Sequence, residues 1–160
     1  MKLLVLPLVF AALAGQAAAL SCIRPDPILT FQRVAAAPEP YYVLYGQLDF
    51  GQTALPGFDL SQQREDPDPI AAQFTGKSLT SDGFTTDYTS PVTLQISCVA
   101  SWCGSARSGV DAIYFVRADT QPAIVHAGAC GGMIFEQPAQ AMLDMLTSCM
   151  QGGTCSAQPF

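Results

Sequence analysis

The stretch VTLQISCV, residues 92–99, has the clearest β-strand pattern in this chain of 160 residues. Successive side chains of a strand point to opposite faces, so strict alternation of apolar and polar residues predicts a strand with one buried face. One face carries the apolar residues Val92, Leu94, Ile96 and Cys98, and the other carries Thr93, Gln95, Ser97 and Val99, of which all but Val99 are polar. We therefore expect a sheet that covers one hydrophobic core.

Further strands are predicted on both sides of this stretch. The segment YYVLYGQLDF, residues 41–50, alternates in the same way around Gly46, and a glycine there indicates a bulge or a sharp bend. AAQFTGKSL and GFTTDY flank the turn TSDG, and DAIYFVRA and PAIVHAG follow each other at hairpin spacing. Residues 51–70 are rich in Gly, Pro and acidic residues, lack either period, and predict a surface loop.

A helix is predicted at each end of the domain. In DPILTFQRVAAAP, Asp26 can cap a helix, Pro27 fits its first position, and Ile28, Phe31 and Val34 or Ala35 share one face. Near the C-terminus, Pro138 can start a helix that Gly152 ends. Its apolar stripe has helical spacing: Ala139, Met142, Leu143, Leu146 and Cys149 or Met150. The expected fold class is all-β with flanking helices.

Residues 1–19 have the pattern of a secretory signal peptide. Lys2 precedes a short apolar run, and small residues at Ala17 and Ala19 satisfy the A-x-A cleavage rule. We expect cleavage after Ala19, which leaves residues 20–160 as a single domain. No later stretch reaches the roughly 18 apolar residues that a transmembrane helix needs, so we expect none in the mature chain.

The charge of the mature chain excludes some partners. Without Lys2, six Lys or Arg residues stand against thirteen Asp or Glu residues, a formal charge of −7. Nucleic-acid binding requires a basic patch, and the six basic residues are scattered singly, so we expect no nucleic-acid partner. The Ala-rich composition and short signal favour a bacterial periplasm or secretion from a bacterial cell.

All six cysteines lie beyond the signal: Cys22, Cys98, Cys103, Cys130, Cys149 and Cys155. An even number in an exported chain predicts three disulfides. Lipidation of Cys22 would leave an odd thiol, and the preceding Ala-Leu-Ser lacks the leucine of a lipobox three places upstream. We therefore expect Cys22 to form a disulfide and not to carry a lipid.

No catalytic or cofactor motif is complete. Cys103 lies in a Trp-Cys-Gly sequence, but the second cysteine of a thioredoxin-like redox motif is missing, which favours a structural disulfide. The acidic stretches REDPDP and SDGFTTD lack EF-hand spacing. His126 is the single histidine, so a hydrolase-type enzyme would have to use it with a carboxylate such as Asp111 or Asp119. We expect no cofactor, no metal and no enzymatic activity, with this hydrolase as an alternative.

The order of these elements resembles the netrin-like family, whose best-known members are the tissue inhibitors of metalloproteinases. The resemblance covers residues 22 to about 150: an early cysteine, a short helix, YYVLYGQLDF, a central WCG, DAIYFVRA, AIVHAGAC and a closing helix. It implies a five-stranded OB-type barrel with flanking helices. Cys22, Cys103 with Gly104, and Cys130 match family positions, whereas Arg24 replaces the second cysteine of the family's CxC, and Cys98 and Cys155 have no counterpart.

Sequence spacing gives a disulfide connectivity that agrees with this resemblance. Cys98 with Cys103, and Cys149 with Cys155, are close enough to pair locally, which leaves Cys22 for Cys130. The last bridge encloses about a hundred residues and contributes on the order of 4 to 5 kcal/mol in the chain-entropy model.

The function that follows is a non-enzymatic, exported binding or protein-interaction module, with a protein or small ligand as its partner. The alternative implied by the resemblance is a metalloprotease inhibitor that binds the protease zinc through the free α-amine and carbonyl of an N-terminal Cys22. Cleavage after Ala19 leaves Leu20 and Ser21 in front of Cys22, so we predict that this chelation does not occur.

Overall fold

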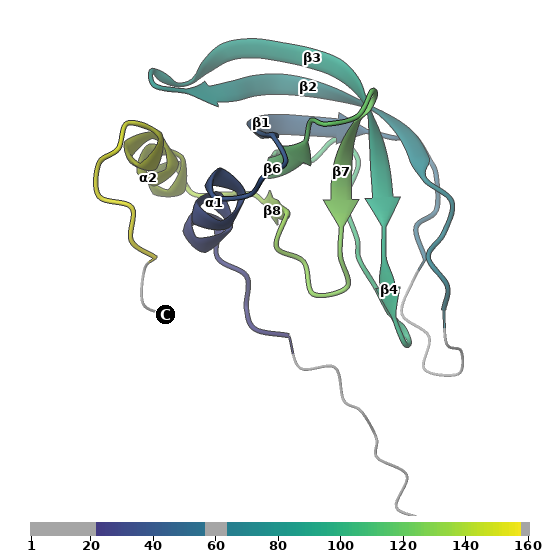
Figure 1. Cartoon of the computed structure of the whole chain (residues 1–160). Coiled ribbons are helices and arrows are strands. Elements are labelled where there is room, and N and C mark those ends of the chain that lie inside the picture. Colours follow the sequence, from purple (N-terminus) through teal and green to yellow (C-terminus); the bar gives the residue numbers. More distant parts are fainter. Residues whose placement is uncertain (1–21, 57–63, 158–160) are drawn as a thin grey trace, which may run out of the picture.

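The computed structural model describes residues 22–56 and 64–157, which form a mostly β structure with a helix near each end (Figure 1). The predicted combination of a β-rich domain, two helices and three disulfides is confirmed. The elements in chain order are α1 (Pro27–Ala35), β1 (Tyr41–Asp49), β2 (Ile70–Thr80), β3 (Gly83–Ile96), β4 (Cys98–Val99), β5 (Trp102–Cys103), β6 (Ala112–Arg117), β7 (Ala123–Ala127), β8 (Ile134–Glu136) and α2 (Gln140–Met150).

Six strands form one sheet in the order β1-β2-β3-β7-β6-β8, and β1 also pairs with β6. The β3–β7 pair is parallel and the other pairs are antiparallel. One edge of β6 pairs with β1, while the other pairs with β7 at Val116 and Arg117 and with β8 at its beginning. β6 is therefore central, and five of its six residues are buried.

The inner face of the sheet holds the larger of two hydrophobic cores. Its members come mainly from the alternating positions of the strands: Leu44, Leu48, Phe74, Val92, Leu94, Ile96, Ala112, Tyr114, Val116, Ala123, Val125 and Ala127. The Phe74 and Tyr114 rings meet edge to face, with centroids 5.5 Å apart. Val92, Leu94 and Ile96 are at most 1% exposed, as their alternation predicted.

Gly46 makes close packing between β1 and β2 possible. It is paired with Gly76, and a Cβ atom on Gly46 would lie 2.3 Å from the Thr75 carbonyl oxygen. The Phe74 ring lies over the two glycines. Of the bulge or sharp bend predicted at Gly46, the bulge is wrong, because the β1–β2 register runs without a shift from Leu44 to Asp49. A register shift occurs instead in the β2–β3 pair, between Ser78 and Leu79 of β2.

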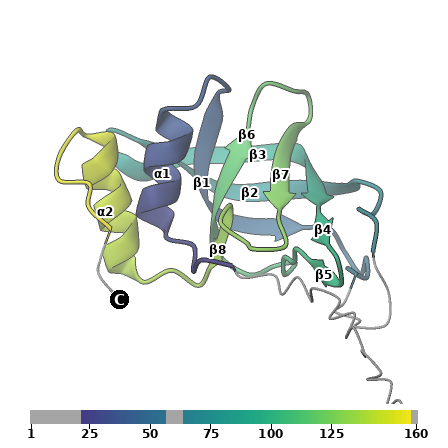
Figure 2. The ribbon, with the colours of Figure 1, turned by 60° about the horizontal axis from the view of Figure 1, so that its bottom comes forward.

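The second core lies between the outer face of the sheet and the two helices. It contains Ile28, Val34, Val43, Leu79, Ile113, Phe115, Leu143, Leu146 and Cys149. The helices lie side by side at one end of the sheet (Figure 2) and contact each other. We call the cores the inner core and the outer core.

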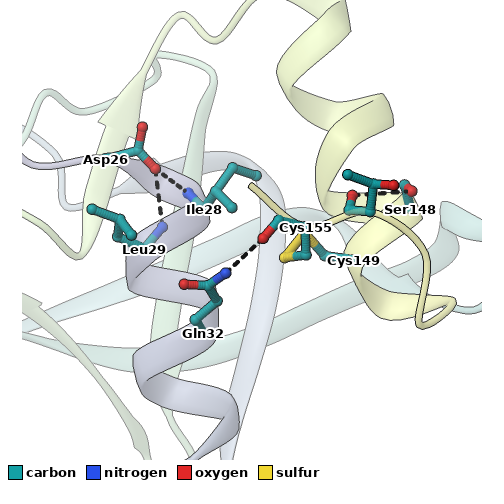
Figure 3. Close-up of a disulfide and its surroundings, with 8 residues drawn as sticks. Asp26, Ile28, Leu29, Gln32, Ser148, Cys149 and Cys155 are labelled. Atoms are coloured by element: carbon teal, nitrogen blue, oxygen red, sulfur yellow. Dashed lines mark hydrogen bonds between the residues drawn. A yellow bond between two sulfur atoms is a disulfide. The ribbon is translucent and has the colours of Figure 1, made fainter. Parts of the chain in front are cut away.

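Helix α1 begins as its sequence predicted. Asp26 Oδ1 accepts hydrogen bonds from Ile28 N at 2.8 Å and Leu29 N at 2.9 Å, and Pro27 follows as the first helical residue (Figure 3). The segment after α2 returns to α1, where Gln32 Nε2 donates to the Cys155 carbonyl at 2.6 Å. The two helices are thus linked by polar contacts as well as by the outer core.

The three disulfides join Cys22 to Cys130, Cys98 to Cys103 and Cys149 to Cys155, the pairs expected from sequence spacing. The first spans 108 residues and ties the chain before α1 to the segment after β7. The second closes the β4–β5 ladder, and the third joins the end of α2 to the tail that follows it.

Some element boundaries differ from the predictions. GFTTDY and the start of VTLQISCV belong to one strand, β3, which passes through Pro91 and ends at Ile96. Cys98 and Val99 form the separate ladder with Trp102 and Cys103. The three-residue strand β8 was not predicted. The expected signal peptide, residues 1–19, and Leu20 lie outside the described residues, as does part of the 51–70 loop.

Candidate functional site

A hollow lies between α1, the outer face of the sheet and the segment 128–133, and we call it the α1–β7 groove. Its volume is about 650 Å³, within the range usual for small-ligand sites. Its polar side chains are Arg33, Tyr41, Gln95, Arg117 and His126. Its apolar side chains include Val34, Val99, Phe115, Ile124 and Met133. An apolar lining with a few polar groups is typical of ligand pockets.

The strand register builds the floor of the groove. Arg117 of β6 is paired with Tyr41 of β1 on one side and with Ile124 of β7 on the other, so the three side chains share a face. His126 lies two residues beyond Ile124 on that face and is paired with Gln95 of β3. The floor therefore belongs to four strands of the paired sheet, which hold its side chains in fixed relative positions.

One wall of the groove is the segment 128–133, which is fastened at several points. The Cys22–Cys130 disulfide ties it to the chain before α1. The Gly132 carbonyl accepts hydrogen bonds from Thr30 Oγ1 at 3.0 Å and from Arg33 at 3.5 Å, and the Met133 carbonyl accepts one from Phe115 N at 2.9 Å. Helix α1 and the sheet thus both hold this wall in place.

The groove is basic in an acidic chain. Arg33, Arg117 and the single histidine line it, and no described Asp or Glu does. Asp119 lies just outside the lining and forms an ion pair with Arg117, in which Arg117 Nε is 2.8 Å from Asp119 Oδ1. Both side chains are more than one-third exposed, although the Nε atom of Arg117 is itself buried.

The structure does not bring His126 together with the two carboxylates named from the sequence. Asp111 immediately precedes β6 and Asp119 follows it, so the two acids lie at opposite ends of that strand. Asp119 is engaged by Arg117, and the His126 side chain has no hydrogen bond or ion pair within residues 22–56 and 64–157. His126 is half-buried in the groove, where it is accessible to a ligand.

A smaller hollow of about 280 Å³ shares His126 and the segment 128–133 with the groove. It extends to Cys103, Gly104 and Glu136. Glu136 accepts a hydrogen bond from Arg107 Nε at 2.6 Å, and this bond raises the pKa of the Arg107 guanidinium. The carboxylate of this hollow is therefore already engaged with a cation.

The remaining sequence candidates lie apart from the groove floor. Cys22 is exposed in its disulfide, and the described part of the chain contains no group of three or more His, Cys, Asp or Glu side chains placed to hold a metal. No described helix is both long and apolar enough to cross a membrane. No sequence pattern predicted Arg33, Tyr41 and Arg117 as site residues, because they meet through strand pairing and helix packing between distant segments.

Comparisons with protein-family models, with curated proteins and with solved structures find no significant match to this chain.

Proposed function

We propose that the protein is an exported, disulfide-linked binding module of the bacterial envelope, and that its ligand site is the α1–β7 groove. The observation that carries this proposal is the groove itself, whose floor comes from four paired strands and whose wall is fastened by a disulfide and by hydrogen bonds to α1 and the sheet. A binding site held on rigid elements loses little conformational freedom when a ligand enters it.

We also propose an OB-type, netrin-like arrangement for the domain. An OB-fold is a five-stranded, partly open Greek-key barrel. Support comes from the pairing order β1-β2-β3-β7-β6, the additional β1–β6 pairs and the parallel β3–β7 pair. The three disulfides, with no free cysteine among the described residues, support an oxidising compartment such as the periplasm or the cell exterior.

The binding proposal is tested with the purified, exported protein and a library of small soluble compounds, followed by two-dimensional NMR. Binding is expected to move resonances of residues around the groove. The variant Ala37→Trp places a large ring in the groove and is expected to abolish these shifts. Ala36→Trp makes the same change on the neighbouring exposed residue, which does not line the groove, and is expected to leave them intact.

Enzymatic turnover would contradict this proposal. The same protein is assayed with ester, amide, phosphoester and glycoside substrates, and no turnover above background is expected. Turnover that is lost in His126→Ala, while folding is retained, would instead establish the alternative of a hydrolase that uses His126.

A second candidate function, metalloprotease inhibition, is favoured by the exposed position of Cys22 and its disulfide to Cys130. It requires a free α-amine on Cys22, whereas cleavage after Ala19 would place that nitrogen in a peptide bond. Mass spectrometry of the exported protein shows whether its first residue is Leu20 or Cys22. We expect Leu20 as the first residue and no inhibition; Cys22 as an unblocked first residue, together with inhibition, would reverse the assignment.

A further inference from the structure

The charge of the α1–β7 groove selects a class of ligand. Residues 20–160 have an excess of acidic over basic residues, yet two of the six basic residues and the single histidine line this groove, and none of the described carboxylates does. A concave site lined by one sign of charge concentrates the opposite charge at its mouth. A negatively charged ligand is therefore favoured here, against the overall charge of the chain.

The net charge of the groove indicates which ligand charge fits it best, and it depends on the groups that Arg33 and Arg117 already contact. Arg117 forms an ion pair with Asp119, whose carboxylate contacts Nε and offsets the positive charge of the guanidinium. Arg33 donates to a neutral carbonyl, that of Gly132, and keeps its full charge. The net excess in the groove is thus about one positive charge when His126 is neutral, which matches a monoanion better than a dianion.

The chemistry of the ligand follows from the rest of the lining. A guanidinium presents parallel N–H donors that fit the two oxygens of a carboxylate. Around it, the partly buried Ile124 and Met133 provide apolar surface for the body of the molecule, and Val99 provides more at the rim, where it is 50% exposed. An inorganic anion would leave this apolar surface unused.

We propose that the α1–β7 groove binds an organic carboxylate with an apolar body, through Arg117 and Arg33. This proposal rests on the proposed binding function and adds the class of ligand. Two sources share this chemistry: a free small acid, and the C-terminal carboxylate of a peptide with an apolar last residue.

The test compares probes that share one body and differ in charge. 4-Phenylbutyrate, 4-phenylbutyramide and 4-phenylbutylamine are titrated into the disulfide-intact mature protein, and NMR follows the groove resonances. The acid is expected to bind at least tenfold more tightly than the amide, and the amine is expected not to bind. Acetyl-Ala-Ala-Phe with a free or an amidated C-terminus then distinguishes the sources, because preference for the free peptide over phenylbutyrate indicates a peptide terminus.

Two variants of opposite expected effect identify the cation that binds the acid. Arg117→Gln is expected to weaken acid binding about tenfold and to leave amide binding unchanged. Asp119→Asn removes the competing carboxylate and is expected to strengthen acid binding several-fold, whereas a merely structural ion pair would make both variants weaken it. Lys77→Gln, which removes an equal charge on β2 outside the groove, serves as the control and is expected to have no effect.

The outcomes separate this proposal from the one on which it rests. Equal binding of acid and amide in the groove, or weaker acid binding in Asp119→Asn, would overturn the carboxylate proposal and leave the groove as a binding site. If library compounds and all the probes leave the groove resonances unmoved, both proposals fail.

Discussion

The two faces of the sheet are covered in different ways. The inner core is built mainly by residues of the strands, and it includes large side chains with no exposed surface, such as Phe74 and Leu94. The outer core is built where α1 packs on β1 and β6 and α2 packs on β2 and β3. Three methionines, Met133, Met142 and Met145, are only partly buried at its margin.

This difference explains where the candidate site lies. Strands hold the inner core through hydrogen bonds along their length, whereas the helices need additional ties: the Cys22–Cys130 and Cys149–Cys155 disulfides and the Gln32 contact with Cys155. The two short helices do not cover the whole outer face, and the α1–β7 groove lies beside α1. The inner core is thus held by strand pairing, and the groove that we propose as a binding site lies on the outer face.

The largest expected effect comes from removing the longest of these ties. The double variant Cys22→Ser/Cys130→Ser opens a loop of 108 residues and is expected to lower the free energy of unfolding by on the order of 4 to 5 kcal/mol. Cys149→Ser/Cys155→Ser is the matched control. It opens a loop whose ends are only six residues apart, and it is expected to lower the free energy of unfolding by about 2 kcal/mol. Urea denaturation measures both, and equal losses would contradict the assignment of the first disulfide as the main tie.

A leucine truncation in each core compares the two cores directly. Leu94 and Leu146 are both fully buried, the first in the inner core and the second on α2 in the outer core. Leu94→Ala is expected to cost about 4 kcal/mol, because β3 is paired on both edges and cannot move into the cavity. Leu146→Ala is expected to cost about 2 kcal/mol, because α2 is not paired with strands on its two sides and can shift toward the cavity. A larger loss for Leu146→Ala in urea denaturation would reverse this comparison.

The sequence predicted the inner core better than the outer one, for a physical reason. Period-two alternation specifies which side chains face inward, so the burial of Val92, Leu94 and Ile96 was readable from local order. The outer core depends on which helix packs where, and the groove depends on the meeting of Arg33, Tyr41 and Arg117 from three elements. Such tertiary encounters leave no local pattern.

The disulfides are tertiary contacts that the sequence nevertheless predicted. Short spacing specified the two local pairs, and elimination gave the long one. The strand β8 was missed because Ile134–Glu136 is too short to show a period. The long strand β3 was divided in the prediction because Pro91, which cannot donate a ladder hydrogen bond, interrupts its apparent pattern.

The stability of the protein at high pH tests whether the Tyr114 side chain is buried in the inner core. Tyr114 is 1% exposed, and burial, followed by the negative charge of Glu136, raises its pKa to about 12. The folded pKa of Tyr114 lies above the ordinary value of 10.0, so deprotonation of this hydroxyl favours the unfolded chain. The contribution of Tyr114 to the free energy of unfolding is therefore complete below pH 10 and is lost as the pH rises toward 12. The expected loss is on the order of 2 kcal/mol. Tyr114→Phe removes this part of the pH dependence of urea denaturation; an unchanged pH profile in that variant would contradict a secluded hydroxyl.

The smallest expected effect concerns the start of α1, on which one wall of the groove depends. Asp26 accepts hydrogen bonds from Ile28 N and Leu29 N while only 4% exposed, so Asp26→Ala leaves two amide groups without this acceptor. A loss of about 1 kcal/mol is expected, the usual cost of removing an N-cap. Asp26→Asn keeps an oxygen acceptor without the charge and is expected to lose only a few tenths of that amount.

Hydrogen exchange shows whether this loss stays in the outer layer. In Asp26→Ala, amides of α1 and of the segment 128–133, which Thr30 of α1 contacts, are expected to exchange several-fold faster. Amides of β3 and β6 exchange through larger openings that do not depend on α1. Their exchange rates are expected to rise no more than the loss of global stability requires. Uniform acceleration across all strands would mean that the two layers open as one cooperative unit, and the distinction between a stable inner face and a more readily opened outer face would then fail.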